Sequence, residues 1–135
     1  MNFNAVYGTA IVSGVFGWEN ITIAGMTVPE AQVAVVDQAY FPSYNISGIF
    51  GLAFPKLTSE YPGSDPSQDG YYNYMNYEPV FYKMVDQHLS LPTFSFAPQR
   101  GGNKGYLAFG GIPPVNTTGK TAAVPILTVR IIQPL

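Results

Sequence analysis

The stretch from Phe3 to Val36 constrains the fold most, because almost every residue in it favours β-strand. β-Branched and aromatic residues dominate it, and glycines interrupt them at positions 8, 14, 17 and 25. We predict strands over residues 3–7, 11–16, 18–23 and 32–36, with residues 10–28 forming a long twisted ribbon. Glycine inside a ribbon is typical of bulges or of close approach between backbones, so we do not expect these glycines to end it.

The rest of the chain predicts shorter elements. Residues 57–77 are polar and rich in proline, glycine and serine, which indicates a long surface loop. One helix is predicted over residues 79–89, where proline suits the first helical position. Its apolar stripe consists of Val80, Phe81, Met84, Val85 and Leu89. A hairpin is expected over residues 93–97 and 105–110, and one more strand over residues 123–132.

These elements predict an all-β fold of mainly antiparallel strands with one or two short helices. A length of 135 residues suits a single domain, and 14 glycines with 12 prolines argue against long helices. The formal net charge of −2 gives no electrostatic case for nucleic acid. No apolar run approaches the roughly 20 residues that a membrane span requires, and no signal peptide is visible at the N-terminus.

Three N-glycosylation sequons point to a secretory product. Their acceptors are Asn20, Asn45 and Asn116, and three sequons exceed the number expected by chance at this composition. The chain has no cysteine, which excludes disulfides and thiolate metal sites but does not fix the compartment.

Several motifs resemble cofactor or catalytic sites and fail on inspection. The single histidine, His88, follows the predicted helix, and no serine lies in a nucleophile-elbow context, so we interpret His88 as structural. Residues 65–70 resemble the start of a calcium loop, but Asn76 stands where a glutamate belongs. Pro113 and Pro114 are incompatible with a phosphate-binding loop over residues 114–121. We expect no metal and no cofactor.

The acidic residues give no catalytic centre by type alone. All eight aspartates and glutamates fall in predicted loops, turns or the polar side of the helix. None lies in an apolar, glycine-flanked turn that could hold a carboxyl group with a shifted pKa.

Five stretches in register nevertheless resemble the N-terminal lobe of the pepsin-like aspartic proteases. They are VYGTAIVSGVFGWENITIAG, SGIFGLAFP, EPVFYKMVDQHL, TFSFA and GYLAFGGI. The resemblance runs from Phe3 to about Ile112, and the fungal secreted members are the most similar in composition. It implies a partial N-terminal lobe over residues 1–115 of a double-barrel fold and the start of an inter-lobe connection over residues 116–135.

The resemblance also implies roles for the first hairpin. In that family a tyrosine-glycine-threonine turn is the tip of a flap that folds over the substrate cleft. Residues 3–24 would form the flap, with Tyr7 as a wall of the pocket beside the scissile bond. Gly8 and Thr9 would offer backbone hydrogen bonds to an extended peptide, whose alternating N–H and C=O groups suit a hairpin edge.

Other residues would complete that pocket. The resemblance implies that Ile49, in the GIFG segment, points into it. Tyr40 or Phe41 would lie on its opposite side. A peptide or protein is the implied substrate, and the complete enzyme would be a monomer, either secreted or vacuolar.

The sequence departs from the family in lacking the catalytic aspartate turns. Family members cleave peptides with two aspartates, each in an Asp-Thr-Gly or Asp-Ser-Gly turn, that share a proton and activate a water. Neither turn occurs in these 135 residues, and we expect them upstream of Met1 and beyond Leu135. We predict that the isolated chain is inactive. The alternative is a non-catalytic secreted β domain, such as a binding module, decoy or inhibitor derived from a protease.

Overall fold

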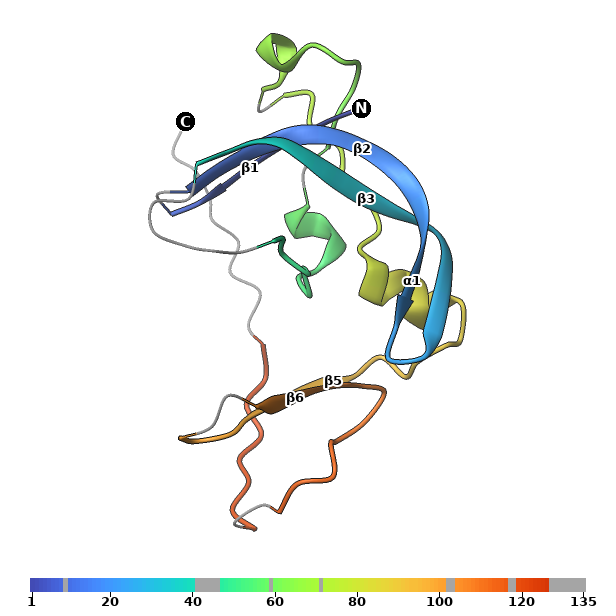
Figure 1. Cartoon of the computed structure of the whole chain (residues 1–135), viewed down its shortest axis with the longest axis vertical. Helices are drawn as coiled ribbons and strands as arrows, with labels where there is room; N and C mark the ends of the chain where they lie inside the picture. The colour runs from blue at the N-terminus through green and yellow to red at the C-terminus, as the bar shows by residue number, and fades with distance from the viewer. Residues whose placement is uncertain are drawn as a thin grey trace.

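Antiparallel strands make up most of the regular structure of this computed structural model (Figure 1). It describes residues 1–8, 10–40, 47–58, 60–70, 72–101, 104–116 and 119–126. The strands are β1 (Asn2–Tyr7), β2 (Ala10–Ile23), β3 (Met26–Tyr40), β4 (Glu60–Tyr61), β5 (Phe94–Pro98) and β6 (Gly105–Phe109). Within those ranges there is one α-helix, α1 (Val80–Asp86), and two short 3-10 helices, Pro55–Leu57 and Pro66–Gln68. The prediction of mainly antiparallel strands with one or two short helices is confirmed.

The strands form a four-stranded sheet in the order β3-β2-β1-β4 and a separate hairpin of β5 and β6. β2 and β3 run side by side as a long curved ribbon, and α1 lies on its concave side (Figure 1). A two-residue turn joins them, with Ala24 at φ 50° and Gly25 at φ 79°. Two consecutive left-handed residues make a turn whose twist matches that of the strands it joins.

Gly14 marks a close approach between backbones, as predicted for a glycine inside the ribbon. A Cβ atom added there would lie 2.0 Å from the carbonyl oxygen of Val35. At the same point the pairing register shifts, because Ser13 pairs with Gln38 and Gly14 pairs with Val36, which leaves Asp37 as a bulge. At Gly17, by contrast, an added Cβ would meet nothing within 4 Å.

The ribbon buries opposite faces at its two ends. In the first half of β2 the even-numbered residues Ala10, Val12 and Phe16 are buried, whereas Ile11 and Val15 are exposed. In the second half the odd-numbered residues Ile21 and Ile23 face the core that surrounds Met84. Side chains alternate between the two faces of a strand, so the ribbon packs one face near the first hairpin and the other near α1.

Helix α1 supplies the centre of the second core. Met84 is fully buried against Val28 and Ala31 of β3. Val80 and Phe109 pack around this cluster, which ties the helix and the β5–β6 hairpin to the ribbon. The helix ends at Asp86, and His88 takes a left-handed φ of 57° just beyond it.

Beyond the ribbon, two regions differ from the sequence-based expectations. Residues 57–77 are not loop alone, because β4 lies within them and pairs with Asn2 and Phe3 of β1. The strand predicted over residues 123–132 is absent from residues 123–126, and the remainder lies outside the described residues. In the part of the chain that is described, no helix is long and apolar enough to cross a membrane.

Candidate functional site

The first hairpin carries an exposed tyrosine at its tip. β1 ends at Tyr7, which pairs across the turn with Ala10, and Gly8 takes a left-handed φ of 63° there. Glycine is the residue that adopts this conformation at least cost. Tyr7 is 46% exposed. Thr9, the remaining turn residue in the predicted site, lies outside the described residues.

An aromatic cluster lies behind this tip. The ring of Phe16 is edge-on to Tyr77, with centroids 4.7 Å apart, and edge-on to Phe3 at 5.4 Å. Paired residues of neighbouring antiparallel strands share a face, so Tyr7 and Ala10 lie on the same face as Phe3 and Phe16. We call Phe3, Phe16 and Tyr77 the aromatic cluster.

Thr58 fixes the backbone of Tyr77. The Thr58 hydroxyl accepts a hydrogen bond from the Tyr77 backbone N–H at 2.9 Å. The same hydroxyl lies within donating distance of the Pro55 carbonyl oxygen, at 2.6 Å, and of the Tyr77 carbonyl oxygen, at 3.2 Å. The aromatic ring is therefore held at the end of the polar stretch of residues 57–77, outside any regular strand.

The electrostatics link Tyr77 to the hairpin tip. Burial raises the pKa of the Tyr77 hydroxyl, and the nearby Tyr7 and Glu60 side chains raise this pKa further. Glu60 is only 4% exposed, and its Oε1 atom is buried with no hydrogen-bond partner among the described residues. Sequence analysis did not single out Tyr77 or Glu60; the run of tyrosines before Glu78 was the one feature that pointed to this segment.

The other predicted pocket residues lie outside the first hairpin in the sequence. Tyr40 pairs with Ile11, which points to the opposite face of the sheet from Ala10 and Tyr7. Ile49 is 53% exposed in an irregular segment. No hydrogen bond or ring contact joins Tyr7, Tyr40 and Ile49 among the described residues. Phe41 lies outside them, as does the acceptor Asn45.

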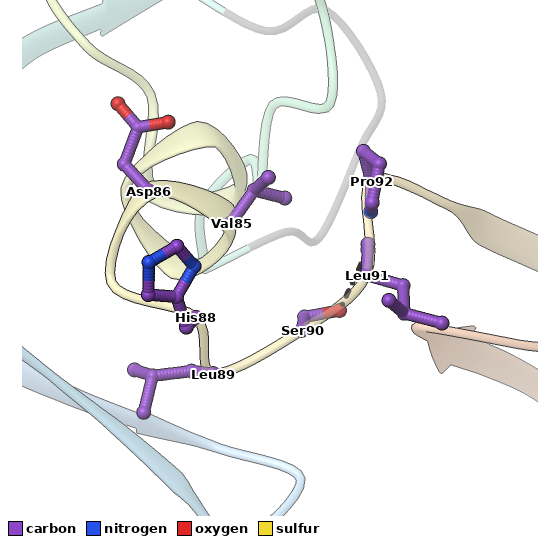
Figure 2. A pocket seen from close by; sticks show the side chains of 7 residues that line it. All are labelled: Val85, Asp86, His88, Leu89, Ser90, Leu91 and Pro92. Atoms are coloured by element: carbon purple, nitrogen blue, oxygen red, sulfur yellow. Dashed lines mark hydrogen bonds between the residues drawn. The ribbon is translucent and has the colours of Figure 1, made fainter.

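One hollow in the described surface lies elsewhere. It follows α1, has a volume of about 740 Å³ and is open to solvent (Figure 2). It is lined by Val85, Asp86, His88, Leu89, Ser90, Leu91 and Pro92. The Ser90 hydroxyl donates to the Leu91 carbonyl oxygen at 3.0 Å rather than to His88, so these side chains do not form a nucleophile-base pair. A smaller hollow of about 500 Å³ is lined in part by Tyr106 and Asn116.

The described residues also offer no metal centre. They contain no group of three or more histidine, cysteine, aspartate or glutamate side chains that could hold an ion. What the arrangement offers chemically is a backbone turn with an aromatic side chain, which suits contact with a ligand rather than bond cleavage.

Comparison with known proteins identifies the group to which this arrangement belongs. The chain is 38% identical over 126 residues to a probable aspartic-type endopeptidase of Aspergillus fumigatus, covering 90% of this chain and 27% of that protein. It is 31% identical to chymosin of Camelus dromedarius, covering 89% of this chain and 29% of chymosin. It is 30% identical to pepsin A of Gallus gallus, covering 89% of this chain and 30% of pepsin A.

The chain thus spans less than a third of the length of these curated relatives. The family model of the eukaryotic aspartyl proteases matches residues 1–133, which is nearly the whole chain. The resemblance to pepsin-like aspartic proteases is confirmed, and the chain belongs to the eukaryotic aspartyl protease family.

Proposed function

We propose that this chain supplies the flap and one wall of the substrate cleft of an aspartic endopeptidase. The observation that carries the proposal is the half-exposed Tyr7 on a tight turn in front of the aromatic cluster, in a chain that the protease family model matches over residues 1–133. Tyr7 forms the wall beside the scissile bond, and Gly8 and Thr9 offer backbone groups to the peptide.

The free edge of the hairpin supports this role. β4 pairs with β1 only at Asn2 and Phe3. From Ala5 to Tyr7, no strand lies beside the outer edge of β1 in the described part of the chain. An extended peptide can add to such an edge through main-chain hydrogen bonds. Closure of a hairpin over the peptide also excludes water, which strengthens electrostatic interactions beneath it.

The roles proposed for the remaining pocket residues rest on family resemblance. Ile49 lines the pocket, and Tyr40 or Phe41 forms its opposite side. Because Tyr40 and Tyr7 lie on opposite faces of the sheet in this chain, the two tyrosines contact different parts of a bound peptide. The parent protein acts as a monomer on peptides or proteins after secretion or transfer to the vacuole.

The bond cleavage itself requires two aspartate-containing turns that do not occur in these 135 residues. Hydrolysis in this family depends on two carboxyl groups that share one proton and activate a water molecule. The sequence has no Asp-Thr-Gly or Asp-Ser-Gly turn. The isolated chain therefore binds without cleaving, and a purified 135-residue chain that hydrolyses peptide bonds contradicts this.

The decisive test uses the complete gene product at acidic pH. We expect peptide hydrolysis that a transition-state-mimicking inhibitor blocks. Tyr7→Ala should lower kcat/KM by about tenfold or more, because a cleft wall that positions the substrate is lost. Thr27→Ser, at the far end of the ribbon, is the matched control and should leave kcat/KM unchanged. Hydrolysis that is insensitive to Tyr7→Ala contradicts the flap role.

A second candidate is a non-catalytic β domain derived from a protease. The exposed Tyr7 and the unpaired edge of β1 beyond Phe3 can serve binding alone, without cleavage. In that case the complete gene product shows no acid-dependent hydrolysis and does not bind the inhibitor, whereas it still binds a protein or peptide partner.

A further inference from the structure

The far end of the ribbon contains a bulge that is held from both sides. Asn20 of β2 faces two residues of β3, Pro29 and Glu30, because Glu19 pairs with Ala31 and Ile21 pairs with Val28. Glu30 adopts a left-handed φ of 51°, which is costly for a residue with a side chain. The Asn20 side-chain oxygen Oδ1 accepts a hydrogen bond from the Glu30 backbone N–H at 3.0 Å.

Lys83 of α1 completes this restraint. Its Nζ atom donates to the Glu30 carbonyl oxygen. Both backbone polar groups of Glu30 are therefore bound by side chains, one from β2 and one from the helix. Such bonds compensate for the strain of the left-handed residue and keep the bulge in one conformation.

The Asn20 side-chain nitrogen, Nδ2, takes no part in holding the bulge. Asn20 is exposed, and among the described residues its Nδ2 atom makes no hydrogen bond. The extra residue of the bulge lies in β3, so the side chains of β2 alternate regularly here. Trp18, Asn20 and Thr22 are all exposed on the outer face, whereas Ile21 points toward the core on the other face.

Asn20, Ile21 and Thr22 form a sequon, and it is the one sequon whose three residues all lie within the described part of the chain. Asn45 lies outside the described part, and so do the two residues that follow Asn116. An N-linked glycan needs an accessible amide nitrogen and space above it. The outer face of the ribbon provides both.

We propose that Asn20 carries an N-linked glycan on Nδ2 while its Oδ1 holds the Glu30 bulge. In the transfer, Nδ2 forms a bond to the anomeric carbon of a lipid-diphosphate-linked oligosaccharide. The bond from that carbon to the diphosphate oxygen breaks, the lipid diphosphate leaves, and the nitrogen gives up one proton to the transferase. The amide carbonyl is retained in the product, so the hydrogen bond to Glu30 and the glycan coexist. This inference goes beyond the proposed function and does not depend on proteolysis.

Trp18 gives the site its own reporter. It is the single tryptophan of the chain and is 60% exposed, two positions before Asn20 on the same face. Neighbours two apart on one strand face lie about 7 Å from each other, which is within reach of the first sugar. The glycan therefore covers an aromatic side chain that is otherwise exposed to water.

The first experiment tests acceptance of the glycan. The full chain behind a secretory leader is translocated into microsomes, and the Asn20 peptide is examined by mass spectrometry after glycan removal. We expect modification in the wild type and its loss in Asn20→Asp and Thr22→Ala. Thr27→Ala is the matched control for Thr22→Ala, because the two hydroxyls bond to each other at 2.9 Å and only Thr22 belongs to the sequon. An unmodified Asn20 in the translocated wild type overturns the proposal.

The second experiment tests the shared amide on the secreted chain. Hydrogen exchange at the Glu30 amide should stay slow in Asn20→Asp, which retains an acceptor oxygen, and become about tenfold faster or more in Asn20→Ala. Unchanged exchange in Asn20→Ala overturns the structural half of the proposal. Trimming the glycan to one sugar should leave Trp18 fluorescence protected from a soluble quencher, whereas complete removal should expose it. Equal quenching in the untrimmed, trimmed and deglycosylated forms shows that the sugar does not cover Trp18 and contradicts that contact.

Discussion

The ring of Tyr77 lies edge-on against Phe16, with ring centroids 4.7 Å apart and an interplanar angle of 60°. This contact connects the end of the polar stretch of residues 57–77 to the middle of β2. It places the aromatic cluster behind the hairpin that carries Tyr7, so packing and the candidate site depend on the same side chains.

Truncation of Phe16 should destabilise the fold strongly. Phe16 is 8% exposed and contacts both Phe3 and Tyr77. We expect Phe16→Ala to lower the free energy of unfolding by about 3–5 kcal/mol, measured by urea denaturation followed by circular dichroism. Val15→Ala is the control, because Val15 is 47% exposed on the other face. Equal losses for both variants contradict the burial described here.

Gly14 and Gly17 should respond differently to the same substitution. The Cβ of alanine at position 14 would lie 2.0 Å from the Val35 carbonyl oxygen, which forces the strands apart. We expect Gly14→Ala to cost about 2–3 kcal/mol of unfolding free energy. At position 17 the added carbon meets nothing within 4 Å, so Gly17→Ala should stay within about 0.5 kcal/mol of the wild type. Thermal and urea unfolding of the two variants side by side decide the matter.

The turn between β2 and β3 should accept a stabilising substitution. Ala24 has a φ of 50° and precedes Gly25, and asparagine followed by glycine is the preferred pair for such a turn. Ala24→Asn should raise the free energy of unfolding by about 0.5–1 kcal/mol, because alanine pays more for the left-handed conformation. Ala24→Val should lower it, since a β-branched residue tolerates this conformation poorly. Stability that follows the opposite order argues against the turn.

Protonation of the Glu78 carboxyl group should raise the free energy of unfolding in acid. Burial, a side-chain hydrogen bond with Asp86 and the charge of Asp86 raise the pKa of Glu78 above 4.5, while Lys83 opposes the rise. A carboxyl group with a raised pKa in the folded state binds its proton more tightly there than in the unfolded state. Its contribution is therefore complete below the ordinary pKa and is lost as the pH rises through the folded-state pKa.

The measurement is the urea midpoint as a function of pH. For the wild type, the midpoint should rise as the pH falls from neutrality to about 4.5. Glu78→Gln should flatten that part of the profile, because the titrating group is removed. Asp86→Asn should weaken the dependence as well, since it removes the neighbouring negative charge. A profile that keeps its slope in Glu78→Gln assigns the dependence to other groups.

Local sequence patterns predicted the strands well and their limits less well. The β-branched runs of β1 and β2 were recognised, but β3 extends from Met26 to Tyr40 rather than over residues 32–36 alone. Pro29 and Glu30 lie outside the predicted strand but inside β3, where Asn20 and Lys83 bind the bulge at Glu30. Those partners are 10 and 53 residues away in sequence, and no local pattern contains them.

In the candidate site, too, local features could be predicted and contacts between distant residues could not. Tyr7 at a hairpin tip could be predicted, because the turn and its flanking strands are contiguous in sequence. The approach of Tyr77 to Phe16 could not, since it joins β2 to the end of a long polar segment that is far away in sequence. β4 was missed for the same reason, as its two residues form a strand only by pairing with β1.

The change of buried face along the ribbon protects its alignment. If β2 and β3 slid past each other by a single position, alternation would turn Val28 and Ala31 away from Met84 at one end. The same slide would upset the partners of Val12 and Phe16 at the other end. A shifted register would therefore disrupt packing at both ends of the ribbon at once. Only one pairing register of these two long, glycine-rich strands buries both sets of side chains.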